Sequence, residues 1–453
     1  MSFSKRLLSG DAPALVPGEN FKVVTYTGNG GTQAITGVGF KPDFVWCKRR
    51  NEGSDHNLTD STRGIKTGLN INSNAQEGNQ DPLGVTVFGD DGFTVSDNDG
   101  GGASVNGTND TYVAWCWKAA GGATSNSDGS TTSTVNANKA AGFSIVTYTG
   151  TGSNASVGHG LGAPAKFIMI KKRSGASDWT AFTAIDNTKY LEPNGTPPFR
   201  TSNVWQNTDP TSSVFTLTTG GDSNGGSATY VAYCFADVEG YQKFGSYDGN
   251  GSTNGPVVNV GFEPAYVMVK NVDSTDNWLI LDNKRNTANP RNNLLQMNLS
   301  NAESTEVGAQ MNFYSNGFQS VGTGGGAGSG QINSNGDKYL YWAIAATAAE
   351  TAEVKAANEA LKASPVPSTT AQLRKDKEDD TFFATKSAIS RSRDIQKESE
   401  DTGKSIAEIG RESAPSTEPQ SDDDKAAEEA GATRGVGGQR GMNKGGLMKK
   451  KKK

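Results

Sequence analysis

Histidine and cysteine are scarce in this chain, which has two histidines and three cysteines among 453 residues. His56 and His159 lie far apart, and neither accompanies a serine or cysteine nucleophile signature, so a histidine-based catalytic triad is not indicated. His56 follows Asp55 in a polar stretch, and we expect it to be a surface residue. The cysteines are Cys47, Cys116 and Cys234. Their odd number and wide spacing favour buried packing over disulfides or a zinc site.

Long apolar runs are also absent, since no stretch approaches the ~20 residues that a membrane-spanning helix needs. The first 20 residues contain no apolar signal region, so we expect synthesis in a cytoplasm and no transmembrane segment. The net charge of −5 is small, which argues against general nucleic-acid binding by the folded part.

What the chain does have is an internal repeat, and no long amphipathic helix pattern interrupts it before residue 345. Tyr26, Tyr148 and Tyr247 occupy equivalent places in three copies of one ordered set of signals. The opening strands read FKVVTYTGNG, FSIVTYTGTG and FGSYDGNG, and the closing strands read TYVAWCW, TYVAYCF and KYLYWAI. Each copy is long enough to be a domain, unlike the 20–50-residue unit of a solenoid.

Within each copy the pattern is that of β-strands. The opening segments partly alternate apolar and polar residues, as half-buried strands do. Pro42, Pro164 and Pro264 each precede a short apolar run that ends in lysine, and these runs are typical of strands buried on both faces. The closing strand follows an Asn/Gly-rich turn, and the 57 glycines fit a protein with many tight turns.

The sequence therefore predicts an all-β fold of three tandem β-sandwich, jelly-roll-like domains, followed by a helical-to-disordered C-terminal tail. The expected boundaries are an N-terminal segment 1–20, repeat 1 at 21–120, a linker at 121–140, repeat 2 at 141–238, repeat 3 at 239–346, helical segments at 347–412 and a disordered tail at 413–453. The linker is assigned from its Gly/Ser/Thr/Asn composition.

The tail differs in composition from the repeats. Ala346–Lys362 is rich in strong helix formers, and the residues from Ser413 onward contain almost no large apolar side chain. Arg434–Lys453 carries eight positive charges and no acid. This basic end either docks on an acidic partner or is a solvated tail, and the sequence leaves both open.

Few residues suggest chemistry. Asp60 with Arg63, and Asp282 with Arg285, share a D-x-x-R spacing that repeat 2 lacks, where Asp186 lies out of register. We interpret these pairs as structural ion pairs or loop anchors. The alternative of two catalytic carboxylates for glycoside hydrolysis stays open, because such residues can be far apart in the sequence and meet only in the folded structure. The glycine-rich segments after the opening strands predict turns, since no Gly-Lys-Ser/Thr follows them.

The segment Asp97–Gly100 resembles the start of a calcium loop but lacks the closing glutamate. We therefore expect no catalytic, cofactor-binding or metal site, and predict that the protein is not an enzyme.

The YTGNG turn, the GFKPDFVWCK strand, the LTDSTRG element, the DGF pair and the closing TYVAWCW strand together resemble a repeated β domain of unknown function. This domain is found in tail-fibre-like and other virion structural proteins of bacteriophages, especially marine ones. The resemblance covers residues ~20–345 and is clearest in repeat 1; repeat 2 has an extra residue before Pro164, and repeat 3 lacks the cysteine.

The resemblance implies a virion protein, made in the host cytoplasm, with other virion proteins as partners. We expect a tail fibre or appendage that presents loops to a host-surface glycan or receptor, as a homo-oligomer, in particular a trimer, with weak sites made effective by avidity. The alternatives are an architectural capsid or tail decoration protein without host binding, and a jelly-roll enzyme that acts on glycans.

Overall fold

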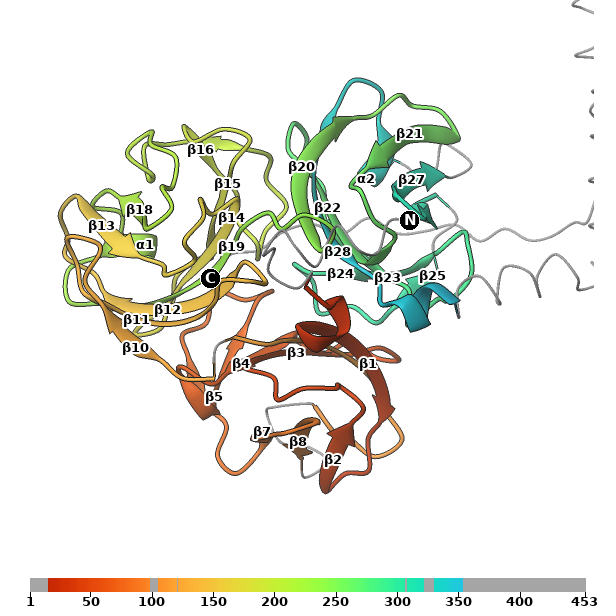
Figure 1. Cartoon of the computed structure of the whole chain (residues 1–453), viewed down its shortest axis with the longest axis horizontal. Coiled ribbons are helices and arrows are strands. Elements are labelled where there is room, and N and C mark those ends of the chain that lie inside the picture. The colour runs from red at the N-terminus through yellow and green to blue at the C-terminus, as the bar shows by residue number, and fades with distance from the viewer. Residues whose placement is uncertain (1–14, 98–104, 120, 306–307, 322–329, 353–453) are drawn as a thin grey trace, which may run out of the picture. The chain divides into compact units, whose positions relative to one another are not determined.

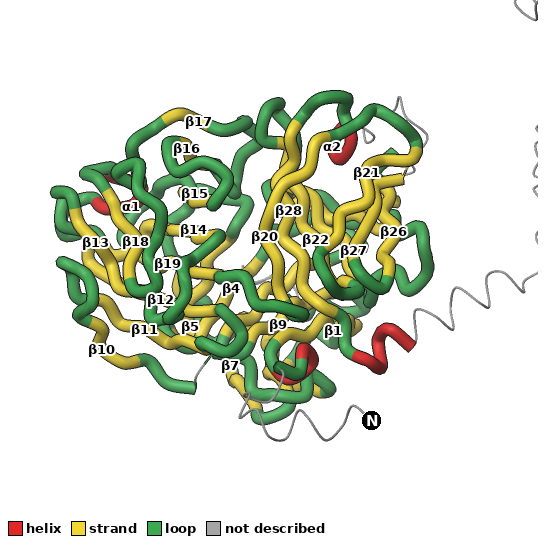
Figure 2. Tube along the Cα trace, turned by 45° about the horizontal axis from the view of Figure 1, so that its top comes forward, coloured by secondary structure: helices red, strands yellow, loops and turns green. Residues whose placement is uncertain are grey.

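Antiparallel strands, joined by loops and turns, recur from one end of the described chain to the other, so the fold is all-β, as predicted (Figure 2). This computed structural model describes residues 15–97, 105–119, 121–305, 308–321 and 330–352. They all belong to one compact unit, Met1–Ser364. No described helix is long and apolar enough to cross a membrane.

Repeat 1 consists of a six-stranded sheet, ordered β1-β9-β3-β4-β5-β6, and a three-stranded sheet, ordered β2-β8-β7 (Figure 1). Val24, Ile35 and Phe93 lie between the two sheets and give the repeat a sandwich-like core. The elements are the 3-10 helix η2 (Pro17–Glu19) and the strands β1 (Phe21–Thr27), β2 (Thr32–Thr36), β3 (Phe44–Arg49), β4 (Asn57–Asp60), β5 (Gly64–Asn70), β6 (Gly78–Asn79), β7 (Gly84–Gly89), β8 (Gly92–Ser96) and β9 (Thr111–Trp117).

Repeat 2 has a six-stranded sheet ordered β10-β11-β12-β19-β14-β15, with the smaller pairs β13-β18 and β16-β17. Its elements are β10 (Thr124–Asn126), β11 (Ser133–Asn138), β12 (Phe143–Thr149), β13 (Ala155–Gly158), β14 (Phe167–Lys172), β15 (Thr180–Thr183), β16 (Lys189–Tyr190), β17 (Arg200–Thr201), β18 (Val214–Leu217), the short helix α1 (Gly221–Asn224) and β19 (Thr229–Phe235). The strands β12, β19 and β14 correspond to β1, β9 and β3 of repeat 1.

Repeat 3 returns to the plan of repeat 1, with sheets ordered β20-β28-β22-β23-β24-β25 and β21-β27-β26. Its elements are β20 (Gln242–Asp248), β21 (Asn254–Asn259), β22 (Pro264–Asn271), β23 (Trp278–Asp282), β24 (Asn293–Gln296), β25 (Ser304–Thr305), β26 (Gln310–Tyr314), β27 (Gly317–Val321), the short helix α2 (Gly330–Asn333) and β28 (Lys338–Ala345).

The tyrosines that define the repeat in sequence are equivalent in structure. The Tyr26 ring stacks on Tyr112 with centroids 5.0 Å apart, and its hydroxyl donates to the Val105 carbonyl at 2.6 Å. The Tyr148 and Tyr247 hydroxyls donate to the carbonyls of Ser223 and Ile332, at 2.6 and 2.7 Å. Three copies of one local arrangement therefore follow from the repeated sequence.

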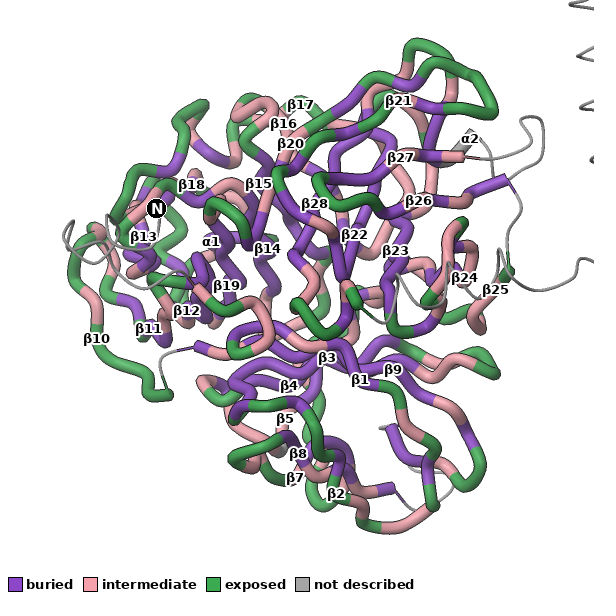
Figure 3. The backbone as a smooth tube through the Cα atoms, turned by 45° about the vertical axis from the view of Figure 1, so that its right-hand side comes forward, coloured by how far each residue is buried: buried purple, intermediate pink, exposed green. Residues whose placement is uncertain are grey.

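The closing strands β9, β19 and β28 are buried on both faces (Figure 3). In β9, Ala114 and Cys116 face the sandwich core of repeat 1, whereas Trp115 and Trp117 face the other way. Those outward tryptophans join a single cluster drawn from all three repeats, which we call the shared core. Its aromatic members include Trp46, Trp115, Trp117, Trp179, Tyr233, Phe235, Tyr266, Trp278 and Trp342. Trp115 is fully buried in this shared core.

The stretch 121–140, expected as a linker, contains the strands β10 and β11. β11 pairs with β12 from Ser133–Tyr148 to Asn138–Phe143 and so extends the sheet of repeat 2. The composition of this stretch suggested a linker because Ser, Thr and Asn are common in linkers. These residues also occur in strands where their polar groups form hydrogen bonds. Asn136 illustrates this, since its Nδ2 donates to Asp43 Oδ1 at 3.0 Å in repeat 1.

The repeats contact one another in cyclic order through three equivalent lysines at the ends of β3, β14 and β22. Lys48 donates to the Ser300 carbonyl of repeat 3 at 3.3 Å, Lys171 to Asn74 of repeat 1 at 2.9 Å, and Lys270 to Thr196 of repeat 2 at 3.1 Å. Burial lowers the pKa of each lysine to about 8. Each repeat is thus attached to the one before it, and repeat 1 closes the cycle onto repeat 3.

The start of the C-terminal helix is the only part of the predicted tail within the described residues. Residues 348–352 are helical, and Thr347 with Glu350 forms a capping box, in which each side chain accepts from the other's backbone N–H. The remaining helical segments, the disordered region and the basic end lie outside the described residues.

Candidate functional site

His56 is buried, not on the surface as expected. Its Nδ1 accepts a hydrogen bond from Trp46 Nε1 at 2.9 Å, and its Nε2 lies 3.1 Å from the Gln296 carbonyl of repeat 3, to which it donates in this tautomer. Burial, and then the charge of Lys48, hold the pKa of His56 well below its usual value. The polar neighbours of His56 in the sequence suggested exposure, but repeat 3 covers this loop. His56 therefore links two repeats.

His159 is also buried, in repeat 2. Its Nδ1 accepts from the Leu161 N–H at 3.2 Å, and its Nε2 lies 3.1 Å from the Thr211 carbonyl. Burial lowers its pKa. Both ring nitrogens are therefore occupied by the backbone, and the histidine organises the loop that follows β13.

The two D-x-x-R pairs are fully buried ion pairs, each of which is contacted by a neighbouring repeat. Asp60 Oδ2 accepts from Arg63 Nε at 2.5 Å and from the Tyr233 hydroxyl of repeat 2 at 2.7 Å. Asp282 Oδ2 accepts from Arg285 Nε at 2.6 Å and from Trp115 Nε1 of repeat 1 at 3.2 Å. The structural interpretation is thus supported, and the pairs also join repeats.

Repeat 2 has no such pair at the end of β15. Thr183 lies there, and its Oγ1 has no hydrogen-bond partner among the described residues. Asp186, three residues later, is partly exposed and pairs with Lys189 at 3.2 Å. The departure of repeat 2 from the sequence pattern therefore removes one of three equivalent inter-repeat anchors.

In the segment considered for calcium binding, the described residue Asp97 binds backbone N–H groups of the protein itself. Asp97 Oδ2 accepts from the N–H groups of Val105 and Asn106, at 3.1 and 3.2 Å, while 98–104 lie outside the described residues. Among the residues described, no cluster of three or more His, Cys, Asp or Glu is placed to hold a metal.

The glycine-rich turns are sites of close backbone approach. A Cβ on Gly28, Gly150 or Gly249 would lie 2.1–2.3 Å from a backbone oxygen of the loop before the closing strand. These glycines are therefore required by packing, which fits the prediction of turns.

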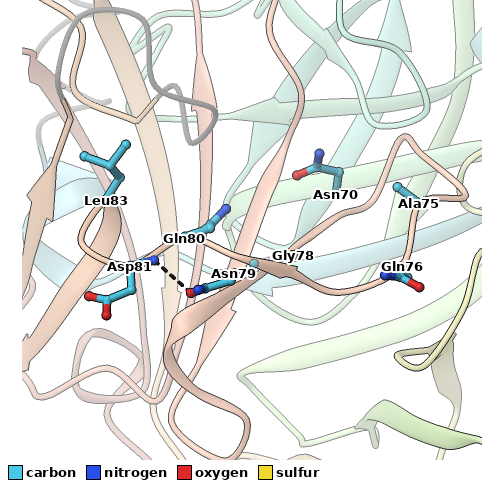
Figure 4. Close-up of a pocket in the computed structure, with 9 residues that line it drawn as sticks. Asn70, Ala75, Gln76, Gly78, Asn79, Gln80, Asp81 and Leu83 are labelled. Carbon is cyan, nitrogen blue, oxygen red and sulfur yellow. Dashed lines mark hydrogen bonds between the residues drawn. The ribbon is translucent and has the colours of Figure 1, made fainter.

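A polar hollow of about 290 Å³ lies beside β5 and β6 in repeat 1 (Figure 4). Strand β5 supplies Gly68 and Asn70, and the rest of the lining follows β5 along the chain. The remaining lining residues are Ala75, Gln76, Gly78, Asn79, Gln80, Asp81 and Leu83. Most polar members are carboxamides, which both donate and accept hydrogen bonds without carrying charge.

Gln80 is the central side chain of this hollow, which we call the amide pocket. Its Oε1 is buried and has no hydrogen-bond partner within the described chain. Its carboxamide lies against two glycines, since a Cβ on Gly68 would be 2.0 Å from Nε2 and one on Gly84 would be 2.6 Å from Oε1. The sequence thus leaves room for this amide by omitting two side chains.

Neighbouring groups in the pocket are fixed by local bonds. Asn79 Oδ1 accepts from the Asp81 N–H at 3.0 Å, drawn as a dashed line in Figure 4. Asn70 Nδ2 donates to Asp55 Oδ2 at 3.0 Å. The loop from Asp81 to Leu83 also lines a second hollow of about 310 Å³, together with Thr32 and Ser96.

The amide pocket can bind a neutral, hydroxyl-rich ligand, because carboxamides match the mixed donor and acceptor character of sugar hydroxyls. Sequence reasoning did not single out these residues. The available signal was the amide-rich run NAQEGNQ at 74–80, but only the folded structure places Gln80 against Gly68 and Gly84.

Comparison with known proteins identifies the family of the chain. No curated protein matches the chain. Residues 16–348 match a domain of unknown function, DUF7483, and the match spans all three repeats and their shared core. The three-repeat unit described above is therefore a member of the DUF7483 family.

Proposed function

We propose that this chain is a structural protein of a bacteriophage virion, a tail fibre or related appendage that attaches to a host-surface glycan or receptor. The virion assignment rests on the motifs of repeat 1 and their resemblance to phage structural proteins. The glycan assignment rests on the amide pocket, and above all on the buried acceptor of Gln80 that has no partner among the described residues.

A single site of this kind gives weak binding, since it offers few polar contacts in an open hollow. In the proposed virion, several copies of the chain in a homotrimer or larger array would raise the avidity without any tighter single site. A stable scaffold suits this role, and the closed cycle of inter-repeat contacts supplies one.

One observation favours the architectural alternative, a capsid or tail decoration protein without host binding. Among the described residues, the large apolar side chains that are exposed are Val16, Val87, Val257 and Tyr314. Aromatic platforms are a common means of sugar recognition, yet most aromatic rings of the described residues are buried in the shared core and in the cores of the single repeats. Host binding and decoration therefore need a direct test.

The proposed test measures adsorption of the purified full-length protein to cells of the bacterium from which the phage is isolated. In the Gly68→Ala variant the new Cβ would displace the flexible Gln80 carboxamide, so we expect adsorption to fall by about tenfold while the melting temperature stays the same. Gly122→Ala is the matched control, because nothing lies within 4 Å of its Cβ.

Equal adsorption of both variants would show that the amide pocket does not bind the host. Absence of adsorption by the unmodified protein, with the chain present in purified particles by mass spectrometry, would favour the decoration role. Absence of the chain from purified particles would overturn the virion assignment.

A further inference from the structure

A third hollow, of about 530 Å³, lies where repeat 1 meets the strand β11. We call it the junction pocket. Junctions of this kind are frequent places for ligand sites because two units contribute side chains to one concave surface. The lining residues are Asn20, Lys41, Asp43, Lys118, Ala119, Gly121, Ala137, Asn138 and Lys139.

The buried acid of the junction pocket is already satisfied by the protein. Asp43 Oδ1 accepts from the Ser61 hydroxyl at 2.7 Å and from Asn136 Nδ2 at 3.0 Å. Asp43 Oδ2 accepts from the Ala119 N–H at 2.8 Å. The carboxylate is therefore committed to joining repeat 1 to β11.

The two amide side chains are committed in the same way. Asn138 Nδ2 donates to Asn20 Oδ1 at 2.8 Å, and Asn20 Nδ2 donates to the Val16 carbonyl at 3.0 Å. Asn138 Oδ1 accepts from the Ala141 N–H at 3.1 Å. The asparagine side chains of the lining therefore have few groups left to bind a ligand.

The lysines are different. Lys41 and Lys139 are exposed and Lys118 is half-buried, and within the described chain none of the three forms an ion pair. The stem of Lys139 lies over Gly162, with Cδ 3.8 Å from where a Cβ would stand. Three lysine residues are therefore among the described residues that line this hollow, and the carboxylate of Asp43, which also lines it, is engaged in internal hydrogen bonds.

We propose that the junction pocket binds an acidic saccharide, one that carries carboxylate or sulfate groups. Ammonium groups donate to anionic oxygens with charge-assisted hydrogen bonds, which are about twice as strong as neutral ones. The volume accommodates a short saccharide segment, and the open hollow admits an internal part of a longer chain. The inference goes beyond the proposed function, because the charge argument concerns a separate site and holds whatever the protein's place in a particle.

The experiment uses the full chain with Lys449–Lys453 changed to glutamine throughout, so that the basic end does not bind the probes. Isothermal titration calorimetry measures binding of a tetragalacturonate, a sulfated tetrasaccharide and neutral maltotetraose. We expect the two acidic probes to bind and maltotetraose not to bind. Raising the salt concentration should weaken the binding.

The decisive comparison is between two triple variants of equal net charge. Lys41→Gln, Lys118→Gln and Lys139→Gln together should raise the dissociation constant about tenfold or more, since charge-assisted contacts are lost. The control carries Lys166→Gln, Lys172→Gln and Lys284→Gln, which lie outside the pocket. Its dissociation constant should stay within about twofold, because charges outside the pocket are screened by salt.

Equal weakening in the two triple variants would overturn the proposal, since it would mean diffuse attraction and no site. Binding of maltotetraose as tightly as tetragalacturonate would also overturn it. The carboxylated and sulfated probes distinguish the two sources of negative charge. Adsorption to host cells is not a readout here, so failure of this inference is separate from failure of the proposed function.

Discussion

Trp115 connects the interior of repeat 1 to repeat 3. Its ring lies 5.3 Å from Trp46 and 6.1 Å from Tyr266 of repeat 3, measured between centroids, and its Nε1 donates to Asp282. The side chain is fully buried. Such a residue combines a large apolar area with one polar contact that another repeat requires.

We predict that Trp115→Ala lowers the free energy of unfolding by ~3–5 kcal/mol, because it leaves a cavity in the shared core. Trp115→Phe is the control for volume, since it keeps a ring but removes the N–H bonded to Asp282. Urea unfolding measures both. An unfolding midpoint for Trp115→Ala equal to that of the unmodified protein would show that this position is not part of the core.

The buried ion pairs allow a test against an exposed pair. Arg285→Ala leaves Asp282 as a buried charge without its main partner, and we expect a loss of ~3–5 kcal/mol. The control is Arg200→Ala, because Arg200 is half exposed in its pair with Glu192 and such pairs contribute about 0–1 kcal/mol. Similar losses in the two variants, by urea unfolding, would contradict the assigned difference in burial.

His56 predicts a pH dependence of stability. Its pKa in the folded protein is well below 6.5, so the unfolded chain binds a proton first as the pH falls. The stabilisation is therefore complete above pH 6.5 and is lost as the pH falls toward the folded pKa, at up to about 1.4 kcal/mol per pH unit.

The His56→Gln variant isolates this effect, because glutamine keeps an acceptor and a donor but does not titrate. We expect thermal melting between pH 7 and 5 to show a smaller loss of stability in the variant than in the unmodified protein. The remaining loss is assigned in part to His159, whose pKa burial also lowers. Identical pH profiles would mean that His56 is not buried as a neutral ring.

At the scale of single elements, β11 is an additional strand of the repeat 2 sheet that the described parts of the other repeats do not show. β11 pairs with β12 on one side and with β10 on the other, so its backbone is used on both edges. In the described chain, β1 and β20 instead form the ends of their sheets. The equivalence of the repeats therefore holds for the central strands and ends at the sheet edges.

Hydrogen exchange distinguishes a paired strand from a linker. We predict that the amides of Ser133–Asn138 exchange slowly, at rates comparable to those of β12, because both elements share one ladder. The exposed turn at 121–123 is the internal reference for fast exchange. Fast exchange throughout 121–140 would restore the linker interpretation.

At the scale of the whole molecule, the shared core makes the repeats depend on one another. Each repeat contributes aromatic side chains that pack against those of the other two repeats. In addition, each junction between repeats contains an equivalent hydrogen bond from a lysine to a backbone carbonyl. The lysines are Lys48, Lys171 and Lys270. The packing favours one cooperative unit over three independent domains.

We predict a single calorimetric unfolding transition for the three-repeat unit, with equal calorimetric and van't Hoff enthalpies. A fragment that ends at Ala119 should fail to fold as a soluble monomer, because Trp46, Trp115 and Trp117 would be exposed to water. Three separate transitions, or a stable fragment with native-like near-ultraviolet circular dichroism, would mean that each repeat folds by itself.

The candidate site depends partly on local sequence and partly on contacts between segments that are distant in the chain. An amide-rich run is visible at 74–80, but its arrangement around Gln80 depends on Gly68 in β5 and on Gly84 at the start of β7. The junction pocket is more extreme, because its lysines come from segments before β3, after β9 and after β11. Neither hollow has a periodic or motif signal that sequence reasoning can use.

The sequence by itself determined the strands and their threefold repetition. Alternation along a strand, prolines before buried runs and glycines at tight turns are local consequences of backbone geometry, so they are legible one segment at a time. The predicted turns at Gly28, Gly150 and Gly249, and the structural nature of Asp60 and Asp282, belong to this class.

Only the tertiary structure decided which face of each closing strand meets another repeat, that His56 is buried, and that 133–138 is a strand. The first two features depend on contacts between residues far apart in the chain, such as Trp115 and Asp282, which are separated by 167 positions. The third depends on pairing with β12, the next strand along the chain. Burial is a property of the assembled surfaces, because a polar loop stays exposed until another repeat covers it. The physical reason is that hydrophobic burial is non-directional, so the sequence states what must be covered but not by which partner.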